Sequence, residues 1–248
     1  MRKPVLALVL GLCAAAATAQ VATAPLAKAP AVSASITAAL ADPARADQAV
    51  DDARRQAAAV IAFAGVKPGD TVVDYLPGQG YWTRIFSPLV GPRGRVFALW
   101  PSIAAKYAER TLPSLQSRAL ANVTAEVQPT PFPSVPAPVD LFWTVQNYHD
   151  IPPAGIARFN AAVFQALKPG GTYLIVDHAD ARGALPSAAG GKHRIDPAVV
   201  KSQVLAAGFR FVGQSTVLAN PADDHSKAVF DPAIRGRTDQ FVFKFRRP

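Results

Sequence analysis

One segment, residues 71–90, constrains the fold more than any other part of the chain. Its first five residues (TVVDY) form a short run rich in β-branched side chains, which predicts a buried strand. A Pro/Gly turn (LPGQG) follows, and the next ten residues (YWTRIFSPLV) have helical spacing. A strand, a tight turn and a helix are typical of an open α/β sheet, whose ligands bind at the carboxyl edge of the strands. Glycines also serve ordinary turns, so the turn alone does not establish a ligand site.

Further strands extend this unit into a sheet. Apolar runs predict four more strands, at 94–99, 122–127, 140–145 and 172–177. Helical spacing predicts three helices, at 102–120 with an interruption at Pro113, at 154–167 and at 197–207. The segment 168–171 (KPGG) is expected to end the second of these helices. Two final strands, at 209–218 and 239–245, have no helix pattern between them, so they should pair antiparallel.

Another helix is expected ahead of the first strand. Residues 47–64 have helical spacing, and Asp47, Asp51 and Asp52 lie near the beginning of that segment. Carboxylates at this end of a helix interact favourably with its dipole. The pattern therefore predicts one continuous helix before the sheet.

The amino terminus has the pattern of a secretory signal peptide. Two basic residues precede an apolar run over 5–17, and a small-residue cleavage site (ATA) ends at Ala19. The run is shorter than the ~20 apolar residues of a membrane span, which disfavours an anchor. We predict a signal peptide at 1–19, a tether with a short helix at 20–43, and one domain at 44–248. The expected location is periplasmic or secreted.

Signal removal changes the composition of the mature chain. Cys13, the only cysteine, would be lost, so the mature chain could form no disulfide. Loss of Arg2 and Lys3 takes the formal charge from +9 to +7, because no acidic residue precedes the cleavage site. The remaining basic residues are scattered without aromatic alternation, so we expect no nucleic-acid partner. The expected partner is a small-molecule or protein acceptor.

Several short motifs accompany the strand pattern over 44–248. They are VVDYLPGQG (72–80), QNYHD (146–150), LKPGG (167–171), VDH (176–178), HRID (193–196) and TDQFVFKF (238–245). With the strand order, they resemble the class I S-adenosylmethionine-dependent methyltransferase superfamily, in particular an exported branch of it. The resemblance implies an α/β fold with a Rossmann-like seven-stranded mixed sheet, helices on both faces and an antiparallel last strand. It also implies the cofactor S-adenosyl-L-methionine over the carboxyl edge.

The first turn supplies the expected cofactor contacts. Gly78 and Gly80 lack Cβ atoms, so their backbone can approach the amino-acid and ribose parts of the cofactor, with Pro77 in the same turn. Asp74, at the end of the strand, resembles the acidic residue that orients the cofactor ammonium group. Alternatively, both glycines only make the turn.

Two positions depart from the superfamily pattern. Leu76 stands where a glycine is common, which leaves the loop less room. Trp100 stands after the second strand, where an acidic residue commonly accepts the ribose hydroxyls. An indole has one N–H donor and no carboxylate acceptor, so Trp100 either stacks on adenine or packs against the sheet.

Polar side chains after the fourth and fifth strands are candidates for chemistry. Asn147 could bind cofactor or substrate, and Tyr148 could form a wall of the site. His149 and His178 are the candidate bases, although methyl transfer depends mainly on positioning and needs a base only for protonated nucleophiles. His149 could equally be a structural histidine hydrogen-bonded to backbone.

The segment 219–238 is long for a connection between paired strands. Loops of this length inside a compact domain are usually functional or disordered, so the segment is expected either to cover the acceptor side or to pack on itself. It contains Asp223, Asp224 and His225, which are expected to be solvated or structural. No Asp/His spacing resembles a dedicated metal site, and none is expected.

Three functions follow as alternatives. The first is a methyltransferase acting on an acceptor in the cell envelope. The second, favoured by Leu76 and Trp100, is a non-catalytic ligand-binding protein on a degenerate methyltransferase fold. A nicotinamide oxidoreductase is disfavoured, because the turn lacks the full Gly-x-Gly-x-x-Gly spacing and the ribose-binding acid.

Overall fold

The computed structural model of the protein describes residues 30–184 and 191–248, so the predicted signal peptide lies outside the described residues. The strands are β1 (Thr71–Tyr75), β2 (Arg95–Trp100), β3 (Val123–Val127), β4 (Val139–Val145), β5 (Leu167–His178), β6 (Arg210–Ser215) and β7 (Gln240–Arg246). The α-helices are α1 (Ala34–Leu40), α2 (Ala46–Ala49), α3 (Ala57–Ala64), α4 (Tyr81–Val90), α5 (Ala105–Gln116), α6 (Ile156–Ala166) and α7 (Pro197–Ala206). None of the helices in these ranges is both long enough and apolar enough to cross a membrane.

The seven strands form one mixed sheet in the order β3-β2-β1-β4-β5-β7-β6. Strand β7 is antiparallel to both of its neighbours, β5 and β6. The other neighbouring pairs, β3–β2, β2–β1, β1–β4 and β4–β5, are parallel. The order reverses at β1 and β4, so the carboxyl ends of these strands open a crevice between diverging connections. This arrangement confirms the predicted fold class.

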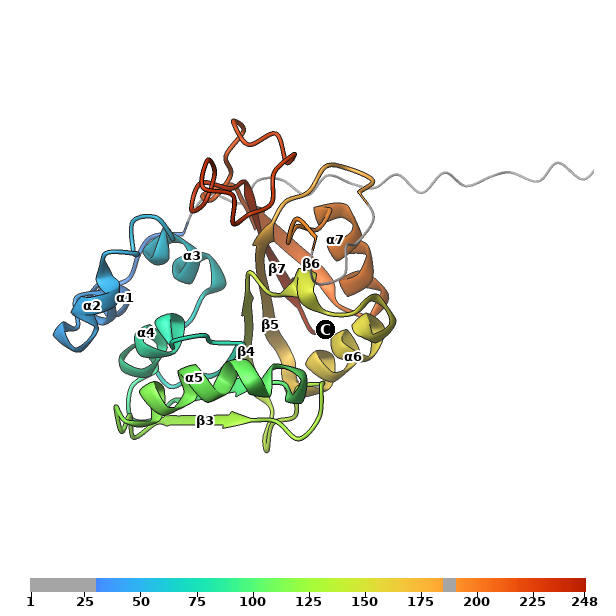
Figure 1. Ribbon diagram of the computed structural model, residues 1–248. Helices are drawn as coiled ribbons and strands as arrows, with labels where there is room; N and C mark the ends of the chain where they lie inside the picture. Colours follow the sequence, from blue (N-terminus) through green and yellow to red (C-terminus); the bar gives the residue numbers. More distant parts are fainter. Residues whose placement is uncertain (1–29, 185–190) are drawn as a thin grey trace, which may run out of the picture.

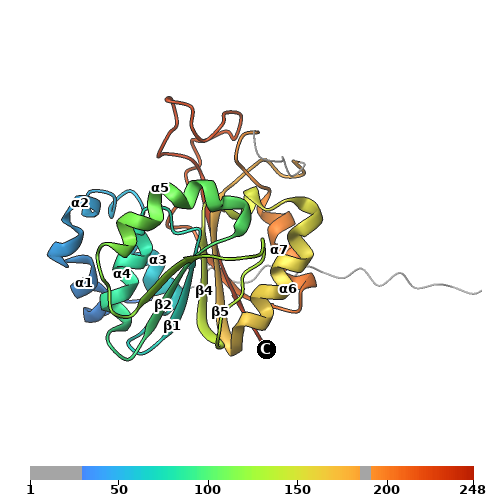
Figure 2. The ribbon, with the colours of Figure 1, turned by 60° about the horizontal axis from the view of Figure 1, so that its bottom comes forward.

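Helices cover both faces of the sheet. In Figures 1 and 2, α1 to α4 lie on one face, and α6 and α7 lie on the other. Val72 of β1 packs into the first layer and Val73 into the second, as the alternation of side chains along a strand requires. Both are fully buried, and burying a valine contributes about 1.5–3 kcal/mol, so the apolar run of β1 stabilises both layers. Ile36 and Ala39 of α1 also belong to the first layer.

The helix predicted over 47–64 is wrong, because the chain forms α2 and α3 with turns between them. Gln56 adopts φ +47° just before α3. Asp52 lies in the turns and accepts hydrogen bonds from the buried Arg45 guanidinium at 2.6 and 2.9 Å, and from the Tyr81 hydroxyl at 2.6 Å. These tertiary contacts outweigh the modest free energy of a continuous helix.

One connection of the sheet also differs from expectation. Helix α5 continues through Pro113 without interruption. Proline has no N–H, so the helix lacks one backbone hydrogen bond there. The crossover between β3 and β4 contains no helix, because prolines at every second or third position fix φ and remove N–H donors. Its prolines are Pro129, Pro131, Pro133, Pro136 and Pro138.

The end of α6 differs as well. The helix stops at Ala166, and β5 begins at Leu167, so the KPGG segment is the start of the strand rather than a helix cap. Gly170 has φ +77° there and donates its N–H to the Arg247 carbonyl at 2.8 Å. The glycines therefore serve the edge of the sheet.

Candidate functional site

A cavity of about 1030 Å³ opens at the carboxyl edge of the sheet, where β1 and β4 meet. Its floor comes from the turn after β1, and further walls come from the segments after β2, β3 and β4. Residues at the cavity from these elements include Leu76, Gly78, Ile103, Tyr107, Phe132, Asn147 and Asp150. The lining is mainly apolar with a few polar groups, which is the usual composition of a small-molecule site.

The turn after β1 has three left-handed residues. Leu76 has φ +56°, Gly78 has φ +58° and Gly80 has φ +75°. Leu76 donates its N–H to the Leu99 carbonyl at 2.8 Å, which fixes the turn against β2. A non-glycine residue in this conformation costs about 1–2 kcal/mol, so Leu76 holds backbone strain at the cavity.

Of the turn residues predicted to contact a cofactor, Pro77 and Gly78 line the cavity, while Gly80 and Asp74 do not. A Cβ at Gly80 would lie 2.7 Å from Leu115 Cδ1 of α5. The absence of a side chain at Gly80 therefore lets α5 pack on the turn, so the structure gives Gly80 a packing role. The approach of the Gly80 backbone to a ligand stays a prediction.

Asp74 is buried below the turn. Its carboxylate accepts a hydrogen bond from Thr83 Oγ1 at 2.6 Å, which joins β1 to the first turn of α4. Burial raises the pKa of Asp74 to about 7, although the Thr83 hydrogen bonds oppose the shift. Asp74 thus orders the turn from beneath and does not border the cavity.

Trp100 and Tyr148 are also buried away from the cavity. Trp100 has no exposed surface and packs among Ala98, Ala108 and Leu115 under α5. This is the packing alternative for Trp100, which cannot stack on a ligand in the cavity from this position. The Tyr148 hydroxyl accepts from Asn160 at 2.8 Å and lies 3.1 Å from Gln203, so Tyr148 belongs to the core under α6 and α7.

Asn147 does border the cavity, and its amide braces the loop after β4. Its Nδ2 donates to the Tyr75 carbonyl at 3.0 Å and to the Val145 carbonyl at 3.1 Å, and its Oδ1 pairs with Thr144. The preceding Gln146 has φ +59°. The bracing amide holds the ends of β1 and β4 together directly beneath the cavity.

The two candidate bases lie behind this loop. His149 Nδ1 is 2.7 Å from the fully buried Asp177 carboxylate, which also accepts the His149 backbone N–H at 2.9 Å. Burial lowers the pKa of His149, but the charge and hydrogen bond of Asp177 outweigh burial, so the net shift is upward. His178 lies 2.8 Å from Thr238 Oγ1, and burial lowers the pKa of His178 to about 4. Neither side chain lines the cavity.

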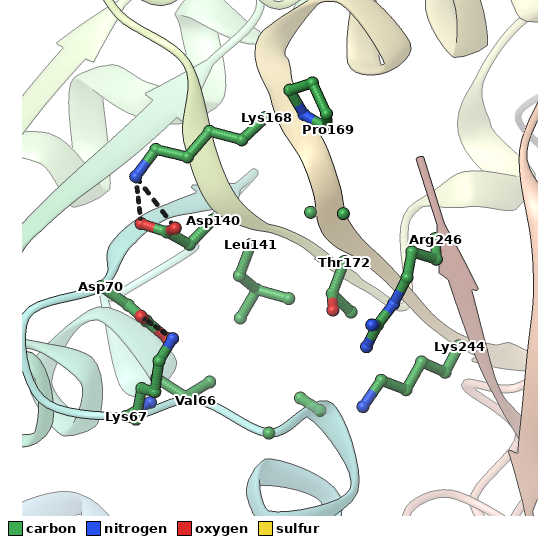
Figure 3. A pocket seen from close by; sticks show the side chains of 14 residues that line it. Val66, Lys67, Asp70, Asp140, Leu141, Lys168, Pro169, Thr172, Lys244 and Arg246 are labelled. Carbon is green, nitrogen blue, oxygen red and sulfur yellow. Dashed lines mark hydrogen bonds and ion pairs between the residues drawn. The ribbon is translucent and has the colours of Figure 1, made fainter. Parts of the chain in front are cut away.

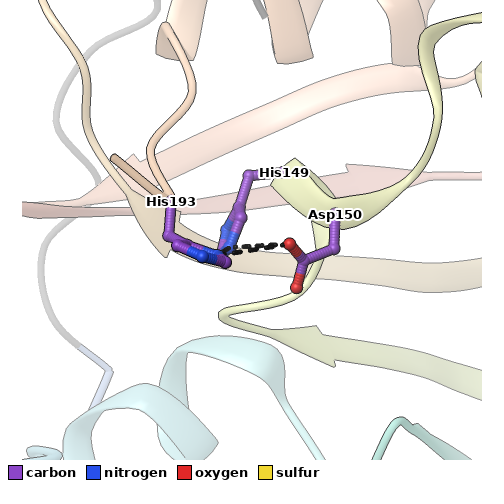
Figure 4. A group of neighbouring side chains, drawn as sticks. All are labelled: His149, Asp150 and His193. Atoms are coloured by element: carbon purple, nitrogen blue, oxygen red, sulfur yellow. Dashed lines mark hydrogen bonds and ion pairs between the residues drawn. The ribbon is translucent and has the colours of Figure 1, made fainter. Parts of the chain in front are cut away.

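A cluster that sequence spacing did not predict lies at the border of the cavity. His149 Nε2, His193 Nδ1 and one Asp150 oxygen converge, as Figure 4 shows. The two histidines are 44 residues apart in the chain, and only the fold brings their loops together. The one available signal was that QNYHD follows β4 and HRID follows β5, at the same edge of the sheet.

The segment 219–238 reaches the cavity through Phe230, whose ring is 5.0 Å from that of His193. Its anchor is Asp223, which is buried and pairs with the equally buried Arg194 guanidinium at 2.8 Å. Asp223 was expected to be either solvated or structural, and the buried pair gives it a structural role. The segment lies beyond the carboxyl ends of the strands (Figure 1, red).

The wall in front of α4 was not foreseen from the sequence. Asp47, Gln48, Asp51 and Arg55 line the cavity there. Arg84 of α4, itself buried, holds Asp47 at 2.6 Å and lowers the pKa of this carboxyl to about 2. The segment 44–56 is thereby fixed across the cavity mouth.

A second pocket, of about 440 Å³, lies at the opposite, amino edge of the sheet. Lys67 pairs there with Asp70, and Lys168 pairs with Asp140, while Lys244 and Arg246 extend from β7 (Figure 3). Open α/β sheets bind ligands at the carboxyl edge, so the larger cavity is the candidate functional site.

No protein-family model matches the chain, and no curated relative matches it either. Solved structures do resemble it. A SAM-dependent methyltransferase from Aquifex aeolicus superposes with a TM-score of 0.56 at 18% identity, covering 86% of this chain and 97% of that one. An S-adenosylmethionine-dependent methyltransferase from Mesorhizobium loti gives 0.55 at 18% identity, over 76% and 96%. The cyclase SpnF gives 0.58 at 16% identity, over 81% and 82%.

The fold is therefore that of the class I S-adenosylmethionine-dependent methyltransferases. Identities this low establish the architecture and leave the reaction open. The cyclase illustrates that one fold serves different chemistry.

Proposed function

We propose that the protein is an S-adenosylmethionine-dependent methyltransferase. The observation that carries this proposal is the large, mainly apolar cavity at the junction of β1 and β4, in the fold shared with such enzymes. In this proposal the backbone at Gly78 approaches the amino-acid part of the cofactor. Ile103, Tyr107 and Phe132 form the apolar wall against adenine.

The chemistry asks little of the protein beyond positioning. A lone pair of the acceptor attacks the methyl carbon, the carbon–sulfur bond breaks, and the sulfonium becomes a neutral thioether. A protonated acceptor also releases a proton. Asp150 is a carboxylate at the cavity border, whereas His149 and His178 lie behind it, so Asp150 is the better placed proton acceptor.

The test is calorimetric titration of the purified protein with S-adenosylmethionine and S-adenosylhomocysteine, with a nicotinamide cofactor as the control. Ile103 is 65% exposed and borders the cavity, so Ile103→Glu should weaken binding strongly while leaving the fold intact. The matched control is Val212→Glu, on the edge strand β6, where a valine is 46% exposed. Absence of binding to the wild type, or equal loss in both variants, would refute the cofactor assignment.

A second candidate is a non-catalytic binding protein on this fold. Leu76 in a left-handed turn and a buried Trp100 in place of a ribose-binding acid both favour it. The two candidates differ in one measurement. A binding protein would hold S-adenosylhomocysteine but convert no S-adenosylmethionine when incubated with an envelope extract, whereas an enzyme would release the thioether product.

We propose further that the protein acts in the periplasm or outside the cell, on an acceptor in the envelope. The support is the basic start, apolar run and ATA site of the first nineteen residues. The mature amino terminus should then be Gln20, which amino-terminal sequencing of the envelope fraction would establish. Recovery of the intact Met1 form from that fraction would contradict cleavage.

The segment 219–238 is proposed to cover the acceptor side of the cavity, since Phe230 lines it. Phe230 is 59% exposed, so Phe230→Ser should not perturb the core. The variant should keep its affinity for S-adenosylhomocysteine and lose turnover. Unchanged turnover would exclude the segment from the acceptor site.

A further inference from the structure

The cluster at the cavity border has the dimensions of a metal site. His149 Nε2 is 3.3 Å from His193 Nδ1 and 3.4 Å from Asp150 Oδ1, and His193 Nδ1 is 3.4 Å from the same oxygen. Zn²⁺ bonds of about 2.0–2.1 Å at a tetrahedral angle separate neighbouring ligand atoms by about 3.3–3.4 Å. Hydrogen bonds to nitrogen or oxygen are usually shorter, about 2.9–3.0 Å. The near-equilateral triangle therefore matches three corners of a tetrahedron.

The tautomer of His149 suits a ligand. Its Nδ1 lies 2.7 Å from Asp177 Oδ1, and a carboxylate can only accept there, so Nδ1 carries the proton and Nε2 presents a lone pair to the cluster. A buried carboxylate behind a ligating histidine fixes the ring and increases its basicity. Asp177 has no exposed surface, which holds this arrangement in place.

His193 is held in position from both sides. Its backbone is left-handed, with φ +55°, and Lys192 and Arg194 anchor the flanking residues. Lys192 pairs with Asp180 at 2.6 Å, and Arg194 pairs with Asp223 at 2.8 Å. A strained backbone persists where its surroundings over-determine it. Both neighbouring cations are thus directed to other carboxylates, and the cluster keeps its negative charge for a cation.

We propose that His149, His193 and Asp150 bind a divalent transition-metal ion, with Zn²⁺ the best match to the geometry. Two imidazoles and a carboxylate are ligands that Zn²⁺ accepts readily. The two charges of the ion balance the carboxylates of Asp150 and Asp177. Three protein ligands leave a fourth position for water or an oxygen or nitrogen of a bound molecule. Metal binding is measured without the proposed methyl transfer and does not depend on it. With the ion bound, Asp150 is a ligand and is not available as the proton acceptor of that reaction.

The test uses the full chain, from which metal is first removed with a chelator that is then dialysed away. The metal-free protein is titrated with Zn²⁺ in the presence of a chromogenic chelator that competes for the ion. The wild type should bind one ion per chain. Co²⁺ should give the intense visible absorption of a four-coordinate ion. His193→Ala removes a ligand, and Asp150→Asn replaces a charged carboxylate ligand by a neutral amide, so affinity should fall by on the order of 100-fold or more in each. Asp177→Asn removes only the supporting carboxylate and should cost roughly 10–100-fold.

The matched control is His225→Ala. His225 has the same 24% side-chain exposure as His193 and a similar left-handed backbone, φ +61°, but it faces Asp239 instead of the cluster. This variant should bind Zn²⁺ as the wild type does. Failure of the wild type to bind, or equal losses in His225→Ala and His193→Ala, would overturn the site. If His193→Ala does not fold, Asp150→Asn still tests the site, because the Asp150 side chain is 40% exposed and its substitution should not disturb the fold.

Discussion

The two edges of the sheet make their sharpest turns in different ways. At the amino edge, five left-handed positions are glycines: Gly65, Gly69, Gly91, Gly170 and Gly208. At the carboxyl edge, Leu76, Gln146 and His193 occupy left-handed positions at the cavity and the cluster, beside glycines such as Gly78. Ala119, ahead of β3, is the exception at the amino edge. Glycine adopts this conformation without steric cost, so the carboxyl edge keeps side chains where stability alone would favour glycine.

The edges also differ in how they use charge. The amino-edge pairs, such as Lys168 with Asp140, leave 46% and 25% of the two side chains exposed. At the carboxyl edge, Arg194 and Asp223 are exposed by 0% and 1%. The amino edge has partly solvated pairs around the smaller pocket, whereas the carboxyl edge is held by buried polar groups around the larger cavity. Substitutions should therefore have unequal effects at the two edges.

The largest effect is expected from Asp223→Ala. The substitution leaves the Arg194 guanidinium buried without its carboxylate, and breaking such a pair costs about 3–5 kcal/mol. Urea denaturation followed by circular dichroism would measure the loss. Asp224→Ala changes an exposed carboxylate one residue away and should leave the free energy of unfolding nearly unchanged. Similar losses in both variants would contradict the contrast between buried and solvated charge.

The next effect is a pH dependence from Asp74. Burial raises the pKa of Asp74 to about 7 in the folded protein, against about 3.9 in an unfolded chain. The folded state then binds more protons than the unfolded state between these values, so stability falls as pH rises. Between pH 5 and 7 the loss should be roughly 2–3 kcal/mol. Asp74→Asn cannot ionise and should remove this slope in denaturation measured across that range.

Asp140, at the amino edge, should give a pH dependence of stability with the opposite sign to that of Asp74. Burial alone would raise the pKa of Asp140, but hydrogen bonds from Lys168 and the Thr71 N–H outweigh burial and lower it. Its contribution is present above the unfolded pKa and lost as pH falls through the folded value. Asp140→Asn should therefore weaken the protein near pH 7 and not at low pH. Slopes of the same sign for both residues would break the comparison.

A smaller effect on stability is expected from replacing a left-handed glycine by alanine at the amino edge, or the left-handed Leu76 by glycine at the carboxyl edge. A Cβ at Gly170 would meet no atom within 4 Å, so Gly170→Ala adds only backbone strain, about 1–2 kcal/mol. Leu76→Gly relieves similar backbone strain, but it also increases the conformational entropy of the unfolded chain and removes apolar contacts. These effects oppose each other, so the free energy of unfolding should change by less than about 1 kcal/mol. Thermal unfolding of both variants compares them. A large loss in Leu76→Gly would show that Leu76 is retained for packing alone.

The smallest effect is expected from Lys168→Ala. The pair with Asp140 is half solvated, and such pairs contribute about 0–1 kcal/mol. The difference from the wild type should shrink further at high salt, where exposed charges are screened. Urea denaturation at low and high ionic strength measures it. A loss as large as that of Asp223→Ala would mean that the amino edge is held by its ion pairs.

Much of the fold was available from local sequence. Short runs rich in apolar and β-branched residues located all seven strands. A strand buried on both faces needs continuous apolar residues whatever its neighbours are, while the edge strands β3 and β6 are only partly buried. The lack of a helix pattern before the last strand predicted the antiparallel pair. The predicted helix over 47–64 was wrong because contacts from Arg45 and Tyr81 select turns there. Local propensity contains no information on such distant partners.

The candidate site divides in the same way. The sequence by itself determined that the turn after β1 and the loop after β4 meet at one edge, and Pro77, Gly78 and Asn147 do line the cavity there. Only the tertiary structure decided that Trp100 and Tyr148 face the core, because the direction of a side chain depends on which helix covers it. The cluster of His149, Asp150 and His193 likewise exists only once two distant loops are folded together, since its geometry depends on distances in space that spacing along the chain does not encode.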